Sequence, residues 1–97
     1  MPDAALPETV LQEKSAVREL CNRLRRVEGQ ARGVVRMIEE GRSCADIAVQ
    51  MAALKAAVNR AAMAFVASYL QQCLAEAKEE DAADALSRVA QMFMRLA

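Results

Sequence analysis

The chain has 97 residues and a formal net charge of zero, and 55% of its residues are hydrophobic while only 3% are aromatic. This length allows one small domain, whose thin core is usually completed by a second copy. The sequence has no apolar run of roughly 18 residues and no charged N-terminus followed by an apolar stretch, so we expect neither a membrane helix nor a signal peptide. We expect a cytoplasmic protein whose three cysteines are ligands, redox sensors or core residues rather than structural disulfides.

The first helix is predicted over residues 9–40, beginning between Thr9 and Ser15 and ending at Gly41. Before it, residues 1–8 contain both prolines and no periodic pattern, so we expect a mobile arm there and a single helical domain over residues 9–97. Gly29 and Gly33 would let another helix approach closely. The apolar positions of this helix follow a heptad pattern: Val17, Leu20, Leu24, Val27, Ala31, Val34 and Ile38.

A second, longer helix is predicted over residues 44–78, and a third over residues 81–96. Ser43 followed by Asp46 resembles a capping box, which would start the second helix at Cys44. This helix carries two adjacent apolar stripes, so we expect it to contact both the first helix and a second subunit. No segment has the alternation of a strand, and the predicted fold class is all-α with three helices. The two stripes are Ile47, Met51, Leu54, Val58, Ala61 and Phe65, and beside them Ala48, Ala52, Ala62, Val66, Tyr69 and Cys73.

Cys44 and Cys73 lie 29 residues apart on this second helix, which is about 43 Å along a straight helix axis. The two thiols can meet only if two chains pair antiparallel or if the helix folds back. Antiparallel pairing would place Cys44 opposite the partner subunit's Cys73 and would make mostly apolar pairs between, as a two-fold interface requires. Cys44 would lie in the first helical turn, where backbone N–H groups favour a thiolate.

Such a thiol pair has two main chemistries and one simpler explanation. Soft thiolates bind Cu(I), commonly with a third ligand such as imidazole, but the chain contains no histidine. Alternatively, one thiolate attacks an oxidised sulfur species and the second resolves the product as a bridge. An equally favoured interpretation is that both cysteines are small hydrophobic residues buried in the core. For Cys21, packing at the edge of the core is the favoured interpretation.

Basic residues gather on the first helix, and residues 14–60 carry a net charge of +5. This pattern is typical of phosphate-backbone binding, although on charge alone a solvated helix flank is the favoured interpretation. The sequence has no helix-turn-helix pattern and almost no aromatic residue for base stacking. The candidate DNA-binding residues are Arg18, Arg23, Arg25, Arg26, Arg32, Lys55 and Arg60.

The segment from Arg23 to Glu39 reads R-L-x-R-x-x-G-Q-x-x-G-x-x-R-M-I-E, and the segment from Cys44 to Ala53 reads C-x-D-I-x-x-Q-x-x-A. These patterns resemble the copper-sensitive operon repressor family (CsoR/RcnR/FrmR). The resemblance implies an antiparallel four-helix-bundle dimer that assembles into a disc-shaped tetramer and represses transcription through basic helix surfaces. It implies operator DNA as the partner, with Arg23 and Arg60 at DNA-contacting positions, and a sensor site that spans the dimer. An enzyme is not expected.

Departures from the copper pattern suggest which inducer acts. Cys44 and Cys73 match the two cysteines of copper sensors, but Tyr69 stands where those sensors carry histidine. This combination resembles the persulfide-sensing branch, the CsoR-like sulfurtransferase repressors, in which a di- or polysulfide bridge would join Cys44 to the partner subunit's Cys73. A Cu(I) sensor using the same two thiolates is the alternative. Pro2 is also found in formaldehyde sensors, but the longer arm and Cys73 argue against that branch.

Overall fold

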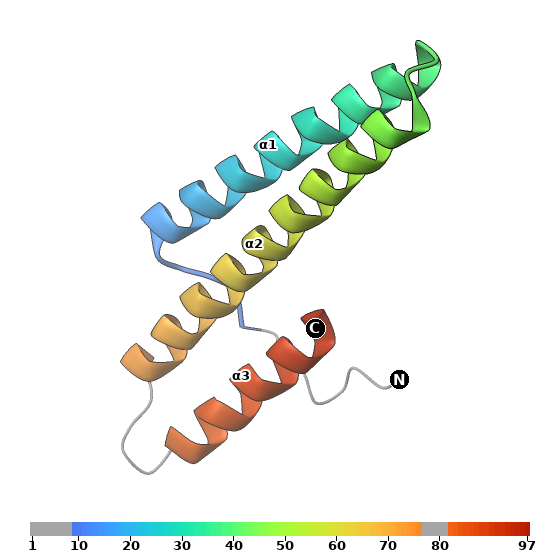
Figure 1. The fold of residues 1–97 in the computed structure, drawn as a ribbon. Helices are drawn as coiled ribbons and strands as arrows, with labels where there is room; N and C mark the ends of the chain where they lie inside the picture. Colours follow the sequence, from blue (N-terminus) through green and yellow to red (C-terminus); the bar gives the residue numbers. More distant parts are fainter. Residues whose placement is uncertain (1–8, 77–81) are drawn as a thin grey trace.

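The computed structural model describes residues 9–76 and 82–97, so the expected mobile arm at residues 1–8 lies outside the described part. Three helices make up its secondary structure: α1 (Lys14–Glu39), α2 (Cys44–Glu76) and α3 (Ala82–Leu96). The predicted all-α fold class is confirmed. Figure 1 shows α1 and α2 as a long antiparallel hairpin, with α3 returning along the C-terminal half of α2. The expected end of the second helix at residue 78 and the start of the third at residue 81 fall outside the described residues.

The start of α1 at Lys14 lies within the predicted range from Thr9 to Ser15, and residues 9–13 are not helical. The Glu13 carboxylate accepts hydrogen bonds from the backbone N–H groups of Ser15 and Ala16 and so caps the helix at this point. The Gln72 amide holds the segment before Glu13 on α2. Gln72 accepts a hydrogen bond of 2.9 Å from the Gln12 N–H and donates one of 2.8 Å to the Val10 carbonyl. Figure 1 shows this blue segment crossing α2.

The cap at Glu13 depends on its charge. A hydrogen bond from the Ser15 hydroxyl is the largest cause that lowers the pKa of Glu13, followed by the two backbone N–H groups. Because the pKa is lowered in the folded chain, the cap stabilises α1 above the usual pKa of 4.5. The stabilisation is lost as the pH falls through the folded pKa.

In the turn between α1 and α2, Gly41 follows the end of α1 and Ser43 caps α2, as the sequence predicts. Gly41 has a φ of +72°, and the bonds from its N–H to the Ile38 carbonyl and from the Arg42 N–H to the Met37 carbonyl form a Schellman motif. The Ser43 hydroxyl accepts from the Asp46 N–H at 3.1 Å, which confirms the predicted cap of α2. The Asp46 carboxylate pairs with Arg42 at 3.7 Å.

Replacing Gly41 with alanine is expected to destabilise the protein by about 1 kcal/mol, because a Cβ is disfavoured at positive φ. No atom of the described chain lies within 4 Å of a Cβ built there, so the cost comes from the backbone and not from a clash. Urea unfolding monitored by circular dichroism would measure it. Gly33→Ala is the matched control, because Gly33 is helical and also has open space; this variant should be as stable as the parent or more stable. Equal stability of Gly41→Ala and the parent would contradict this interpretation of the turn.

The core lies between the C-terminal half of α2 and α3. Its buried members are Val66, Tyr69, Cys73, Ala85 and Val89, with Leu11 of the first segment packed against them. Only some of the apolar residues in the predicted heptad pattern of α1 are covered. Leu20, Val27 and Ala31 are half-buried and Val34 is buried, whereas Val17, Leu24 and Ile38 are exposed. Gly29 and Gly33 have open space, so no helix of the described chain makes the close approach expected there.

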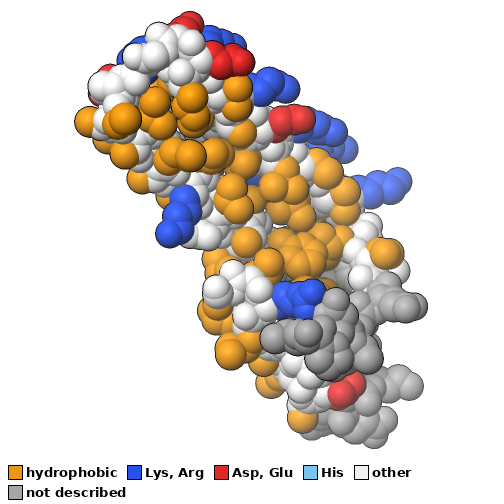
Figure 2. Space-filling view, turned by 90° about the vertical axis from the view of Figure 1, so that its right-hand side faces the viewer, with side chains coloured by type: hydrophobic (Ala, Val, Ile, Leu, Met, Phe, Trp, Pro, Cys, Tyr) orange, Lys and Arg blue, Asp and Glu red, His pale blue; other side chains and the backbone are white. Residues whose placement is uncertain are grey.

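Much of the apolar surface remains uncovered in one protomer. Met51, Val58 and Met63 of α2 are 50%, 44% and 39% exposed, and Leu24 of α1 is 48% exposed. Figure 2 shows hydrophobic side chains along the length of one face, with Lys and Arg along an edge. The radius of gyration is 17.2 Å, against about 13 Å for a compact chain of this size. An elongated protomer with an open apolar face is what a bundle-forming dimer requires.

No helix within residues 9–76 and 82–97 combines the length and the apolar character needed to span a bilayer.

Candidate functional site

Cys44 is the first residue of α2 and is exposed. Its place follows from the Schellman turn at Gly41 and the Ser43 cap, which together fix where the helix begins. The thiol therefore lies at the tip of the hairpin formed by α1 and α2, in the first turn of its helix as predicted, where the helix dipole favours a thiolate.

Cys73 is buried, with 5% of its surface exposed, near the other end of α2. Ala85 and Val89 of α3 pack in the same cluster, and Leu11 lies against it from the first segment. Gln72, the neighbour of Cys73 in sequence, holds that first segment on α2. The environment of Cys73 is thus assembled from three separate parts of the chain.

The two thiols do not meet within one protomer. Both lie on the continuous helix α2, with about 43 Å of helix between them. Within the described part of the chain, no group of three or more Cys, Asp or Glu side chains is arranged to hold a metal ion. Any site that joins Cys44 to Cys73 therefore needs a second chain. Cys21 is half-buried on α1, as expected for a residue at the edge of the core.

Tyr69 occupies the position at which a copper sensor would carry histidine, and it is buried, with 2% exposed. Its ring stacks on Phe65, with 6.5 Å between ring centroids. Desolvation by burial and, after it, the neighbouring Cys73 thiol raise the pKa of Tyr69 to about 12. The phenol is therefore protonated at neutral pH, so it can donate a hydrogen bond but is not an anionic ligand.

A basic groove lies between the middle parts of α1 and α2. Its volume is about 640 Å³ and it is lined by Arg23, Arg26, Val27, Gly29, Gln30, Ala57 and Arg60. A second hollow continues it past Arg23 and Arg60 to Asn59 and Met63. The groove thus brings together three of the predicted DNA-binding arginines from two helices. Arg23 is held by an ion pair of 3.2 Å to Glu19, one turn earlier.

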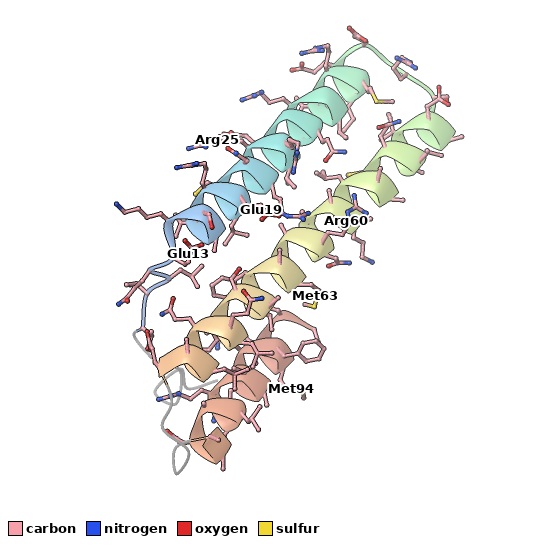
Figure 3. The ribbon with its side chains drawn as sticks, turned by 90° about the vertical axis from the view of Figure 1, so that its left-hand side faces the viewer. Glu13, Glu19, Arg25, Arg60, Met63 and Met94 are labelled. Carbon is pink, nitrogen blue, oxygen red and sulfur yellow. The ribbon has the colours of Figure 1, made fainter. Side chains whose placement is uncertain are left out.

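The other predicted basic residues lie outside this groove. Arg18 shares a shallow hollow with Arg26 on α1. Arg25 donates a hydrogen bond of 3.1 Å to Asn22, and Figure 3 shows Arg25 on the side of α1 away from Arg60 and α2. Arg32 and Lys55 are exposed. The predicted set therefore divides into a groove group and a group on the outer surface.

A family model described as a metal-sensitive transcriptional repressor matches residues 10–95. The chain belongs to this family. Its members are transcriptional repressors and not enzymes, as the sequence predicted.

Curated relatives and solved structures agree with this assignment. The chain is 37% identical over 78 residues to the copper-sensing transcriptional repressor CsoR of Bacillus subtilis, an alignment that covers 79% of this chain and 77% of that protein. It is 37% identical over 75 residues to the copper-sensing repressor RicR of Mycobacterium tuberculosis, covering 77% and 78%. Among solved structures, the copper-sensing repressor CsoR with Cu(I) from Geobacillus thermodenitrificans superposes with a TM-score of 0.76 at 30% identity, covering 93% and 95%. The nickel-responsive regulator InrS also superposes with a TM-score of 0.76, at 27% identity, covering 94% and 100%.

Two residues near the candidate sites were not singled out from the sequence. Gln30 lines the basic groove, and its place in the G-Q pattern of the family was the available signal. Arg88 of α3 lies close enough to Tyr69 to influence the pKa of that hydroxyl. No sequence pattern indicates this proximity, because it arises only when α3 packs on α2. Cys73 thus has Tyr69 as a polar neighbour beside Gln72.

Proposed function

We propose that this repressor binds operator DNA through the groove at Arg23 and Arg60, and that bridging Cys44 to the partner subunit's Cys73 releases the DNA. The proposal requires an antiparallel dimer, and the exposed apolar face at Met51, Val58 and Met63 supports one. Two such dimers would form the tetramer of the family. A bridge would tie the hairpin tip of one subunit to the α2–α3 core of the other, and so would fix the relative positions of the two basic grooves.

The inducer that the site residues favour is a reactive sulfur species, a per- or polysulfide. The observation that carries this choice is the buried Tyr69, which replaces an imidazole with a phenol whose pKa is about 12. A protonated phenol supplies no third ligand of the kind that Cu(I) sites commonly use. Two thiols alone are sufficient for attack on a sulfane sulfur and resolution as a bridge.

Cu(I) is the second candidate inducer, and the comparisons favour it. The relatives at 37% identity are named as copper sensors, and a structural relative is a copper sensor with Cu(I). Two thiolates from two subunits are soft ligands that suit Cu(I) without a third donor.

A DNA-release experiment with each inducer in turn distinguishes the two candidates. Reduced protein on a fluorescent operator fragment is titrated anaerobically with inorganic polysulfide or with Cu(I), and anisotropy reports the bound fraction. We expect release by polysulfide at stoichiometric amounts, with recovery after addition of a thiol reductant. Release by Cu(I) that is reversed by a Cu(I) chelator, without release by polysulfide, would establish the copper function instead. Tyr69→His should then strengthen Cu(I) binding.

A further inference from the structure

Two buried polar groups near Cys73 have no hydrogen-bond partner among the described residues. They are the hydroxyl of Tyr69 and the Nε–H of Arg88. Buried polar groups in folded proteins are nearly always hydrogen-bonded, because an unpaired donor away from water is costly. Apart from the Cys73 thiol beside Tyr69, neither donor has an acceptor among the described residues, so both can donate to a group that comes close to this thiol.

The two donors come from different helices, and the Tyr69 hydroxyl lies near both the Cys73 thiol and Arg88. Tyr69 precedes Cys73 by one turn, so both side chains lie on the same face of α2. Arg88 lies on α3 between Ala85 and Val89, which pack in the same cluster as Cys73. After desolvation, the Cys73 thiol and the Arg88 charge act on the pKa of the Tyr69 hydroxyl in opposite directions. The hydroxyl is therefore near both the thiol and the guanidinium.

We propose that Tyr69 and Arg88 form a donor pocket that binds anionic sulfur at Cys73. Its ligands are the polysulfide anion that arrives and the persulfide anion that remains after reaction. Both side chains can donate, and the guanidinium has no acceptor at all, so the pocket selects a negatively charged acceptor over a neutral one. This inference deepens the proposed reactive-sulfur function and rests on it.

The chemical step explains why a cation is needed there. The Cys73 thiolate attacks the terminal sulfur of a hydropolysulfide anion, so that one S–S bond forms and one S–S bond of the polysulfide breaks. The electron pair leaves with the shortened polysulfide dianion, which water protonates; Cys73 is oxidised to the persulfide and the polysulfide is reduced. Because both reactants are anions, they repel each other unless a positive charge lies between them. The persulfide then loses its proton and accepts hydrogen bonds from Tyr69 and Arg88.

Acidic neighbours weaken the preference of the pocket for anions. A terminal nitrogen of Arg88 pairs with the Asp84 carboxylate at 3.5 Å, so this ion pair does not use the Nε–H of Arg88. Glu76 also lies near enough to raise the pKa of Tyr69. Removing the Asp84 charge should therefore strengthen the preference of the pocket for anions.

The test uses protein with Cys73 as its single thiol, made with Cys21→Ser and Cys44→Ser. Its alkylation by iodoacetate, which is anionic, is compared with alkylation by iodoacetamide, which is neutral and nearly the same size. We expect Arg88→Gln to lower the iodoacetate-to-iodoacetamide rate ratio by about tenfold, the factor for one lost hydrogen bond to a charged group. Tyr69→Phe should lower the ratio less, and Asp84→Asn should raise it. Persulfide formation from inorganic polysulfide, followed by intact mass, should slow in parallel with the ratio.

Arg25→Gln is the matched control, because it removes the same charge from the outer side of α1 and should leave the ratio unchanged. A general loosening of the core would speed both reagents equally, so an unchanged ratio in Arg88→Gln refutes the pocket whatever the absolute rates. The measurement involves neither DNA nor a second thiol. A changed ratio in the single-thiol protein, together with failure of polysulfide to release the parent protein from DNA, would refute the proposed inducer alone.

Discussion

Replacing Cys44 with serine is expected to abolish release of DNA by polysulfide while leaving the affinity of the reduced protein for DNA unchanged. Cys44 is exposed at the start of α2, so its sulfur makes no contribution to the core. A surface substitution of this kind should change stability by less than about 0.5 kcal/mol. Anisotropy titration of an operator fragment, before and after polysulfide, measures both quantities.

Cys73→Ser should also abolish release, but it should cost stability as well. Its thiol is buried in the cluster with Val66 and Val89, and a hydroxyl placed there costs about 1–3 kcal/mol unless it finds a partner. Cys21→Ser is the control and should respond to polysulfide as the parent does. Normal release of DNA from Cys44→Ser would contradict a two-thiol switch.

Replacing Arg23 or Arg60 with alanine is expected to weaken DNA binding by about tenfold each and to reduce the slope of log affinity against log salt concentration by about one. The two guanidinium groups line one groove although they come from α1 and α2. Each supplies a phosphate contact in the proposed complex, and loss of a phosphate contact weakens binding to all sequences alike. Titrations at two or more salt concentrations, with reduced protein, give the slopes.

The matched control for the groove is Arg42→Ala. Arg42 lies at the hairpin tip, pairs with Asp46 and is outside the groove, so its removal should change affinity by less than about twofold, in keeping with the small value of an exposed ion pair. Equal losses in Arg42→Ala and Arg60→Ala would mean that binding depends on total charge and not on the groove. Unchanged binding in both Arg23→Ala and Arg60→Ala would remove the groove from the DNA interface.

The parts of the fold that depend on local chemistry were predictable from the sequence. The end of α1 at Gly41 and the cap at Ser43 follow from residues that are neighbours in the chain, and they fix the position of Cys44. The sequence placed the start of α1 only within the range from Thr9 to Ser15, because it does not show that the Gln72 amide holds the preceding segment on α2. That pair of hydrogen bonds joins residues about 60 positions apart, and no local propensity indicates it.

The site was predictable only in part, for the same reason. The spacing of Cys44 and Cys73 left either a partner chain or a helix that folds back, and α2 is one continuous helix that holds the two thiols apart. The heptad pattern of α1 did not reveal that Leu24 and Ile38 would remain exposed while Val34 is buried, because a pattern records which residues are apolar and not which partner covers them. Arg88 reaches the surroundings of Cys73 only through the packing of α3 on α2.

Intact mass spectrometry of denatured, unreduced Cys21→Ser protein after polysulfide treatment tests most directly whether Cys44 of one subunit bonds to Cys73 of the other. We expect a species of twice the chain mass plus any bridging sulfur atoms. Proteolysis should yield one cross-linked pair of peptides, which contain Cys44 and Cys73. Species of single-chain mass only, or peptides that join Cys44 to Cys44, would contradict this intersubunit bridge.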